Sequence, residues 1–367
     1  MTLKYRRVWV ALLLIGTVLR FGSAIRDDEL RDDERSRYIP IAQSLSEGNG
    51  FAIGGTPTAL SMPLWPIVLA ALPDGLRAEL LSALLSSLSL LLAWMLARRL
   101  ANDRVALVVL AFMALDVDQI SAAGTVLTEP LFGLLLLLFA VAWADRRIGL
   151  AGVALGLATL TRPEVFLLPG AIFLFDRSIR RAAILSGIVV LMLAPWWARN
   201  TRVFGEFVPF ATTGGTTMAA GMNAGDEELS FRRKGQGRGR FWKEVHAEPK
   251  SGNEAADDKK YRNRAIDYAL ENPGQAALAT AAKAVLLWTP VQRKGTSIVY
   301  ALAVLLAWWA IVKRTKFSPP LVGPALLLLT LVGLMFVAIP RYRVPYHVFM
   351  FMLAATPVAE FRRAPRL

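Results

Sequence analysis

The chain carries a succession of apolar segments, and most of them are long enough to cross a lipid bilayer as a helix, which takes about 20 residues. They occupy residues 8–25, 76–96, 105–123, 129–144, 148–160, 165–175, 182–197, 297–312, 321–339 and 344–359. Hydrophobic residues make up 55% of the 367 positions, which excludes an ordinary soluble protein. The alternation typical of a membrane barrel is absent. The sequence therefore predicts an all-α polytopic membrane protein with about ten transmembrane helices, or eleven if 275–291 also spans.

Basic residues beside the apolar segments set the orientation, because short loops rich in lysine and arginine stay in the cytoplasm. Lys4, Arg6 and Arg7 place the N-terminus inside. Counting spans from there puts the later basic loops on the same side: Arg98, Arg99, Arg104, Arg146, Arg147, Arg177, Arg180 and Arg181. We therefore expect a multi-pass plasma-membrane protein with both termini cytoplasmic. This topology requires 275–291 to be interfacial or re-entrant.

The same topology divides the chain into six parts. They are a first transmembrane helix (1–25), a first extracytoplasmic loop with amphipathic interfacial helices (26–75), a helix bundle (76–198), a long second extracytoplasmic loop (199–296), C-terminal transmembrane helices (297–360) and a basic cytoplasmic tail (361–367). The two long loops lie outside, so any chemistry built on them is extracytoplasmic.

The first outer loop opens with RDDELRDDERSRY (26–38), which holds six carboxylates and four arginines. A charge run is usually solvated. The alternative is that one of its acids is a catalytic base at the membrane surface. Tyr38, Ile41, Ala42 and Leu45 follow at helical spacing, which predicts a surface helix that starts just before Pro40. The acids would then lie in the loop entering that helix.

Residue types also restrict the cofactors and partners. The absence of cysteine excludes disulfides and thiol catalysis, and only two histidines, His246 and His347, argue against a His-rich metal site. The sequence requires no cofactor and assigns no metal ligands. Asp27, Asp28, Asp32 and Asp33 could hold Mg²⁺ or Mn²⁺, although a solvated run is the commoner arrangement. The net charge of +14 follows from cytoplasmic anchors beside anionic lipid and implies no nucleic-acid partner.

Polar residues gather at the outer ends of the predicted helices. Glu129 begins the fourth span, where Thr128 could cap the helix and an acid would complement its dipole. Thr161 and Glu164 match a capping box, but capping leaves Arg162 unexplained. Arg341 and Arg343 fall on the outer side, although arginines in short loops tend to stay in the cytoplasm. They would serve there as phosphate ligands or as interfacial anchors. Together these residues indicate transfer of a group from a lipid phosphate, with a carboxylate taking a proton and arginines stabilising phosphate charge.

Four stretches resemble one superfamily, the GT-C polyprenyl-phosphate-sugar glycosyltransferases, near the bacterial protein O-mannosyltransferase and lipid A aminoarabinose transferase branch. They are DDERSRYIPIAQSLSEGNGF with PTALSMPLWPIVLAAL, TVLTEPLFGLLL, GLATLTRPEVFLLP with PWWARNTRVFGEFVPFATTGG, and IPRYRVPYHVF. The resemblance implies a GT-C-like fold. It also implies inverting transfer of a sugar from a polyprenyl phosphate to an extracytoplasmic glycan, lipid or protein.

The resemblance also assigns roles. It implies a catalytic base at Asp33, with Glu34 as the alternative, and a second acid at Glu129. It implies contacts to the lipid phosphate from Arg162, Arg341 and Arg343, and substrate contacts from Tyr38, Arg199 and Asn200. Met62–Pro63 stands where the family has tandem prolines.

Two other interpretations stay open. A transporter or flippase of lipid-linked substrates would also have many spans, but it would place polar or broken helices at mid-membrane, whereas the charges here cluster at the outer ends. A catalytically inactive GT-C-like assembly partner would share the fold, and its acids would be replaceable.

Overall fold

Helices form in every predicted apolar segment of the computed structural model, which describes residues 3–26, 32–72, 75–222, 248, 251–292, 295–313, 321–336 and 338–357. The helices of these segments are α1 (Leu3–Ile25), α4 (Gly75–Leu100), α5 (Asp103–Leu115), α6 (Val117–Ala123), α7 (Glu129–Ala144), α8 (Ile148–Thr161), α9 (Leu168–Asp176), α10 (Ile179–Phe204), α15 (Ile298–Val312), α16 (Val322–Met335) and α17 (His347–Ala354). The all-α class is confirmed.

Only some of these helices are long enough to cross a membrane alone. Among the described residues, α1, α4 and α10 are long and apolar enough to cross a membrane. Helices α5 and α6, which meet at an angle of 58°, would make a fourth span if the two together count as one broken span. The apolar helices α7, α8, α15 and α16 contain 14 to 16 residues. They reach roughly 21–24 Å, against about 30 Å of hydrocarbon. The predicted number of about ten spans is therefore not confirmed.

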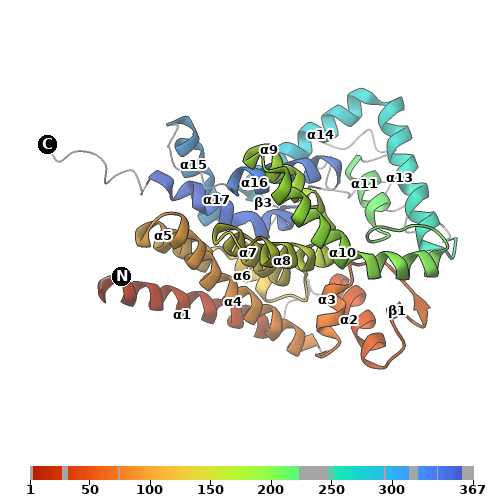
Figure 1. Ribbon diagram of the computed structural model, residues 1–367, viewed down its shortest axis with the longest axis horizontal. Coiled ribbons are helices and arrows are strands. Elements are labelled where there is room, and N and C mark those ends of the chain that lie inside the picture. Colours follow the sequence, from red (N-terminus) through yellow and green to blue (C-terminus); the bar gives the residue numbers. More distant parts are fainter. Residues whose placement is uncertain are drawn as a thin grey trace.

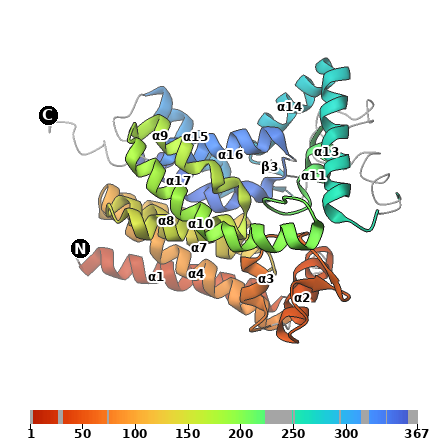
Figure 2. The ribbon, with the colours of Figure 1, turned by 45° about the vertical axis from the view of Figure 1, so that its right-hand side comes forward.

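The bundle is built by helices packed in sequence. α1 lies against α4 and α5, α4 against α7, α7 against α8, and α8 against α10 (Figures 1 and 2). Small residues let α8 and α10 approach closely. A Cβ added at Gly152 would stand 2.5 Å from Ile188 Cδ1, and one at Gly156 would stand 2.3 Å from Met192 Sδ. Close packing of this kind drives helix association where lipid replaces water.

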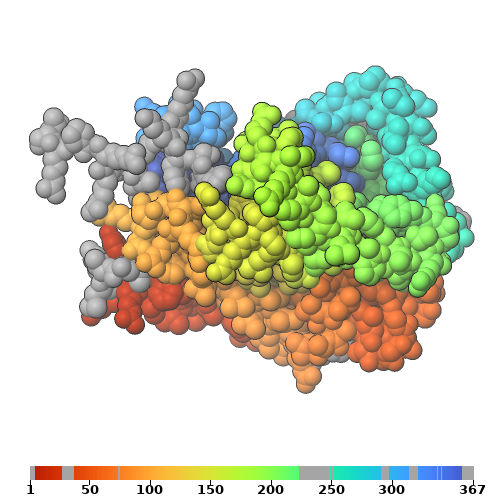
Figure 3. Space-filling model, in the orientation of Figure 1, coloured from red at the N-terminus to blue at the C-terminus, as the bar shows by residue number. Residues whose placement is uncertain are grey.

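The two long segments that the sequence predicts to lie outside, which we call the outer segments, gather at the end of the bundle opposite the start of α1 (Figures 1 and 2). The first contains α2 (Asp32–Ser46), the antiparallel pair β1 (Ala52–Ile53) and β2 (Thr56–Pro57), and α3 (Leu64–Leu69). The second contains α11 (Gly214–Met222), α13 (Glu254–Glu271), α14 (Pro273–Trp288), and the short pair β3 (Val291–Gln292) and β4 (Gly295–Thr296). Figure 3 shows both segments closing this end against α10.

One prediction about the first outer segment is wrong. Helix α2 begins at Asp32, well before Pro40, and Pro40 lies inside it. Proline removes one backbone hydrogen bond from a helix interior, and neighbouring packing tolerates that loss here. Ile41 and Ala42, directly after the proline, are fully buried. The last acids of the charge run are therefore part of a helix and not of an entry loop.

Glu254 joins the two outer segments. Its carboxylate accepts hydrogen bonds from Thr58 Oγ1 at 2.6 Å and the Ala59 N–H at 2.8 Å in the first segment, and from Thr212 Oγ1 at 2.9 Å in the second. Charge-assisted bonds of this type are stronger than neutral ones. The loop around Thr58 is therefore fixed to the start of α13.

Candidate functional site

A largely buried arginine, with 12% of its side chain exposed, links two carboxylates at the predicted outer ends of the bundle helices. Arg162 follows the last residue of α8 and precedes η2, a 3₁₀ helix (Pro163–Leu167). Its Nη1 lies 2.9 Å from Glu129 Oε1, and its Nε lies 2.6 Å from Glu164 Oε1. The Glu129 side chain is only 2% exposed. Burial opposes the charge on Arg162, but Glu164 and Glu129 outweigh that effect and raise the pKa of the guanidinium.

The capping interpretations of these acids are wrong. Thr128 makes no side-chain cap bond, and its hydroxyl lies 3.4 Å from Glu129 Oε2. Thr161 donates back to Leu157 O at 2.9 Å, and Glu164 binds Arg162 instead of forming the predicted capping box. Pairing with Arg162 therefore replaces capping as the local reason for both glutamates.

A second 3₁₀ helix, η3 (Pro340–Tyr346), brings another arginine and an aromatic ring to the same place. Arg341 Nε lies 3.9 Å from Glu129 Oε1. The Tyr342 ring lies under both guanidinium groups, 4.9 Å from Arg162 Cζ and 5.5 Å from Arg341 Cζ, which is the geometry of cation–π contacts. We call Glu129, Arg162, Glu164, Arg341 and Tyr342 the outer-end cluster.

Helix α2 brings Tyr38 to this cluster. Tyr38 is half-buried, and it interacts electrostatically with Glu129, Arg162 and Tyr342. Burial raises the pKa of Tyr38, so its hydroxyl stays protonated and can donate a hydrogen bond. Asp33 and Glu34 belong to the first turn of α2, but their side chains lie outside the described part of the chain.

The other predicted site residues have different surroundings. Arg199 donates to Thr58 O at 2.6 Å and Phe51 O at 2.8 Å, and Asn200 Nδ2 donates to Val208 O at 3.1 Å. These contacts hold the outer loops against the end of α10. Arg343 is fully buried and donates to Leu287 O at 2.9 Å and Thr289 O at 2.5 Å. The structure therefore brings Glu129, Arg162, Arg341 and Tyr38 together, while Arg343 and Arg199 are engaged elsewhere.

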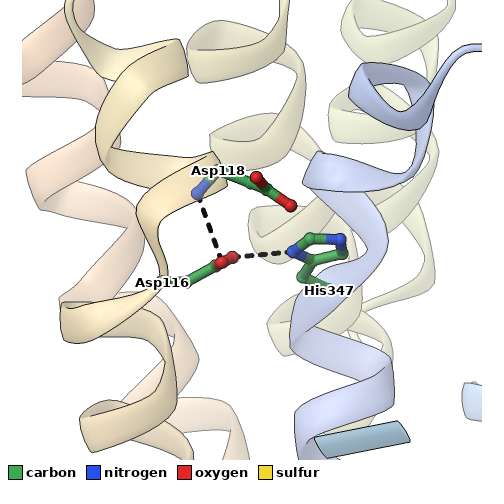
Figure 4. Close-up of side chains that lie close together, drawn as sticks. All are labelled: Asp116, Asp118 and His347. Carbon is green, nitrogen blue, oxygen red and sulfur yellow. Dashed lines mark hydrogen bonds and ion pairs between the residues drawn. The ribbon is translucent and has the colours of Figure 1, made fainter. Parts of the chain in front are cut away.

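A second polar group, which the sequence interpretation missed, lies at the junction of α5 and α6. Asp116 Oδ2 is 2.7 Å from His347 Nδ1, and Asp118 lies beside them (Figure 4). One potential ligand atom from each of the three residues lies within 4.8 Å of the others, so the group could hold a metal ion. A signal was present, because Asp116 and Asp118 interrupt the apolar segment 105–123.

No protein-family model matches the sequence, and no curated protein matches it. Solved structures do match. The archaeal oligosaccharyltransferase AglB from Archaeoglobus fulgidus, in complex with an inhibitory peptide and a dolichol-phosphate, aligns with 100% of this chain at a TM-score of 0.57 and 11% identity. The same oligosaccharyltransferase in complex with Zn and sulfate aligns with 97% of the chain at a TM-score of 0.53 and 12% identity. ArnT from Cupriavidus metallidurans, bound to undecaprenyl phosphate, aligns with 98% of this chain and 78% of its own length at 15% identity. Its TM-score of 0.45 is too low to support an argument.

At these identities the likeness shows the fold alone. The protein is a helical membrane protein whose fold is like that of the archaeal oligosaccharyltransferase AglB, in agreement with the GT-C-like fold expected from the sequence. It spans about half of that relative, because the aligned region covers 52% of the AglB chain.

Proposed function

We propose that this protein is a membrane glycosyltransferase that moves a sugar from a polyprenyl-phosphate donor to an extracytoplasmic acceptor, with inversion at the anomeric carbon. The outer-end cluster is the observation that carries the proposal. It sets two carboxylates, two arginines and a stacked tyrosine beside the gathered outer segments of a GT-C-like fold. Charged side chains beside a membrane core are costly and are often kept for a function.

The two arginines are suited to different tasks. Arg162 is 12% exposed and is engaged by both Glu129 and Glu164, so it fixes the geometry of the cluster. The Arg341 side chain is 39% exposed and lies 3.9 Å from Glu129. Its planar fork can therefore pair with the donor phosphate, whose negative charge grows as the bond to the sugar breaks. The polyprenyl phosphate leaves with that bond's electron pair.

The base belongs to the first turn of α2. Glu129 already accepts a hydrogen bond from Arg162 and its side chain is only 2% exposed, so its carboxylate is poorly placed to reach an acceptor hydroxyl. Residues four positions apart in a helix share a face, so the position of Glu34 relative to Tyr38 favours Glu34 over Asp33. The chosen carboxylate takes the acceptor hydroxyl's proton as that oxygen attacks the anomeric carbon. Glu129 then acts by positioning Arg162 and Arg341.

Release of free polyprenyl phosphate tests the proposal. Protein in lipid nanodiscs is given a panel of polyprenyl-phosphate sugars and a cell-envelope extract as acceptor. We expect release from at least one donor. We expect Glu129→Gln and either Asp33→Asn or Glu34→Gln to abolish it, while Glu29→Gln, a matched change in the same acidic run, leaves it intact.

The negative outcome is equally informative. Folded protein that releases nothing from any donor in the presence of acceptor would overturn the proposal and point to a transporter or an inactive assembly partner. Release that survives all three carboxamide substitutions would overturn the assignment of the acids.

A further inference from the structure

We propose that Asp116, Asp118 and His347 bind a divalent cation of the zinc or manganese class. The site joins the break between α5 and α6 to the first residue of α17 (Figure 4). It is separate from the acidic run of the first outer loop, which was the cation site considered from the sequence.

The local backbone prepares Asp116 for this task. It ends α5 in an extended conformation, with φ −71° and ψ 110°, and it caps α6, with Oδ1 accepting from the Asp118 N–H at 3.3 Å. Its other oxygen, Oδ2, faces His347. Asp116 is fully buried and His347 is 1% exposed, so neither group is a solvated surface charge. Burying a carboxylate without a compensating charge or hydrogen bonds is costly.

The donor set and spacing fit one ion. Two ligands bound to the same zinc at about 2.1 Å stand at most about 4.2 Å apart. The three candidate atoms lie within 4.8 Å of one another, so the more distant atoms would have to approach by about 0.6 Å at most, given that limit. Asp116 Oδ2 and His347 Nδ1, now 2.7 Å apart, would have to separate slightly to admit the ion. An imidazole nitrogen with two carboxylates suits zinc or manganese, whereas magnesium and calcium prefer oxygen ligands alone.

Unsatisfied polar atoms beside the group are a second observation. The Tyr300 ring stacks on the His347 imidazole, with centroids 4.3 Å apart and an angle of 22°. The Tyr300 hydroxyl and His347 Nε2 are buried, and neither has a hydrogen-bond partner among the described residues. Buried polar atoms are rarely left unpaired. An ion with open coordination positions brings bound water, which could supply a partner for the Tyr300 hydroxyl.

Two buried arginines face the group, and each has acceptors of its own. Arg343 Nη2 lies 3.9 Å from Asp118 Oδ2, but Arg343 also donates to two backbone carbonyls and stacks on Tyr300 at 4.0 Å. Arg20 donates to Ser86 Oγ at 2.9 Å, Gly16 O at 3.0 Å and Met113 O at 2.8 Å. Neither guanidinium depends on the carboxylates alone. A divalent ion would therefore compete with Arg343 Nη2 for Asp118, while Arg343 Nη1 keeps its two carbonyl acceptors.

The location suggests what the ion does. Helix η3 runs from Arg341 and Tyr342 in the outer-end cluster to His347, the first residue of α17. An ion held by Asp116 and His347 would fix the C-terminal end of η3 and, through it, the position of Arg341. This positioning role rests on the proposed function, whereas the binding itself does not.

Direct binding of Mn²⁺ to the full chain in nanodiscs tests the inference without donor or acceptor. Protein stripped with EDTA is titrated with Mn²⁺ and followed by electron paramagnetic resonance. We expect one tightly bound ion. We expect Asp118→Asn to weaken binding at least about 10-fold, because it replaces one carboxylate ligand with an amide. Asp118 is chosen because it is the most exposed of the three residues, with 14% of its side chain exposed. The exposed Asp267→Asn on α13 is the matched control and should bind as the parent does.

Substitution with Co²⁺ identifies the nitrogen ligand, because its visible absorption should change in His347→Gln. Equal weak binding by the parent and Asp118→Asn would overturn the inference. Tight binding that survives Asp118→Asn but disappears in the double variant Asp27→Asn/Asp28→Asn would also overturn the inference, because it would assign the ion to the acidic run. Binding without sugar transfer would overturn the proposed function alone, and transfer without binding would overturn this site alone.

Discussion

Replacement of Arg162 by leucine tests whether charge pairing holds the outer-end cluster together. The substitution leaves Glu129 and Glu164 side by side, 2% and 13% exposed, with Arg341 at 3.9 Å as the remaining cation in the cluster. Removing one partner of a buried ion pair costs about 3–5 kcal/mol. The partial exposure of Glu164 and the presence of Arg341 place the expected loss near the lower limit, at about 3 kcal/mol.

Glu129→Gln should cost less, because Arg162 keeps Glu164. It removes the negative charge but keeps an amide oxygen that can still accept from Arg162, so the loss should be at most about 2 kcal/mol. The double variant Arg162→Leu/Glu129→Gln removes the repulsion between the two acids as well. Its loss should therefore fall short of the sum of the single losses by about 0.5–3 kcal/mol, which is the range measured for residues in one network.

Thermal unfolding followed by the fluorescence of the 10 tryptophans measures these differences at a fixed scan rate. At about 2–4 °C per kcal/mol, Arg162→Leu should lower Tm by roughly 6–12 °C. The exposed Arg202→Leu is the matched control and should leave Tm unchanged. The reasoning fails if Arg162→Leu unfolds within about 1 °C of the parent, or if the two single losses simply add.

Three further outcomes follow from other contacts. Glu254→Gln leaves one acceptor oxygen for three donors, so the backbone amides of residues 51–59 should exchange hydrogen about 10-fold faster or more. Hydrogen exchange followed by mass spectrometry measures this change, and an unchanged rate would contradict the link between the outer segments. Because the chain has no cysteine, an introduced cysteine is its single thiol. Glu271→Cys should react with an impermeant maleimide added to intact cells, and Gly149→Cys should not. The reverse pattern would show that the predicted orientation in the membrane is wrong. Gly156→Val should lower Tm by several degrees through overpacking against Met192, whereas Gly149→Ala, which meets open space, should not.

The sequence predicted those parts of the fold that depend on the length of the apolar segments. Each apolar run became a helix, because in a membrane the backbone must bond to itself. The break at Asp116 was not predicted, because the apolar residues on both sides dominate the average over 105–123, although Asp116 and Asp118 gave a local signal. The early start of α2 was missed because Pro40 favours a first turn in isolation, and only tertiary packing shows that it lies within a helix.

The sequence singled out individual residues of the outer-end cluster but could not show how they pair. Glu129 and Arg162 were both singled out, yet they are 33 positions apart, and nothing local shows that they meet. Arg341 and Arg343 looked equivalent in the sequence. In a 3₁₀ helix of three residues per turn, positions two apart point about 120° away from each other, so one arginine reaches Glu129 and the other is buried towards Asp118.

Helix η3 has charged side chains on two of its sides, and its weak backbone hydrogen bonding explains why it needs them. A 3₁₀ helix has weaker internal hydrogen bonds than an α-helix, and Pro340 and Pro345 each remove a backbone donor. Its position must therefore be set by side chains, and those side chains are Arg341 and Tyr342 against the outer-end cluster and Arg343 against Leu287 and Thr289. His347, at its C-terminal end, pairs with Asp116. A segment held in this way keeps one register only while both ends are engaged. The position of Arg341, which we propose as a ligand of the donor phosphate, therefore depends on the buried contacts of Arg343 and His347.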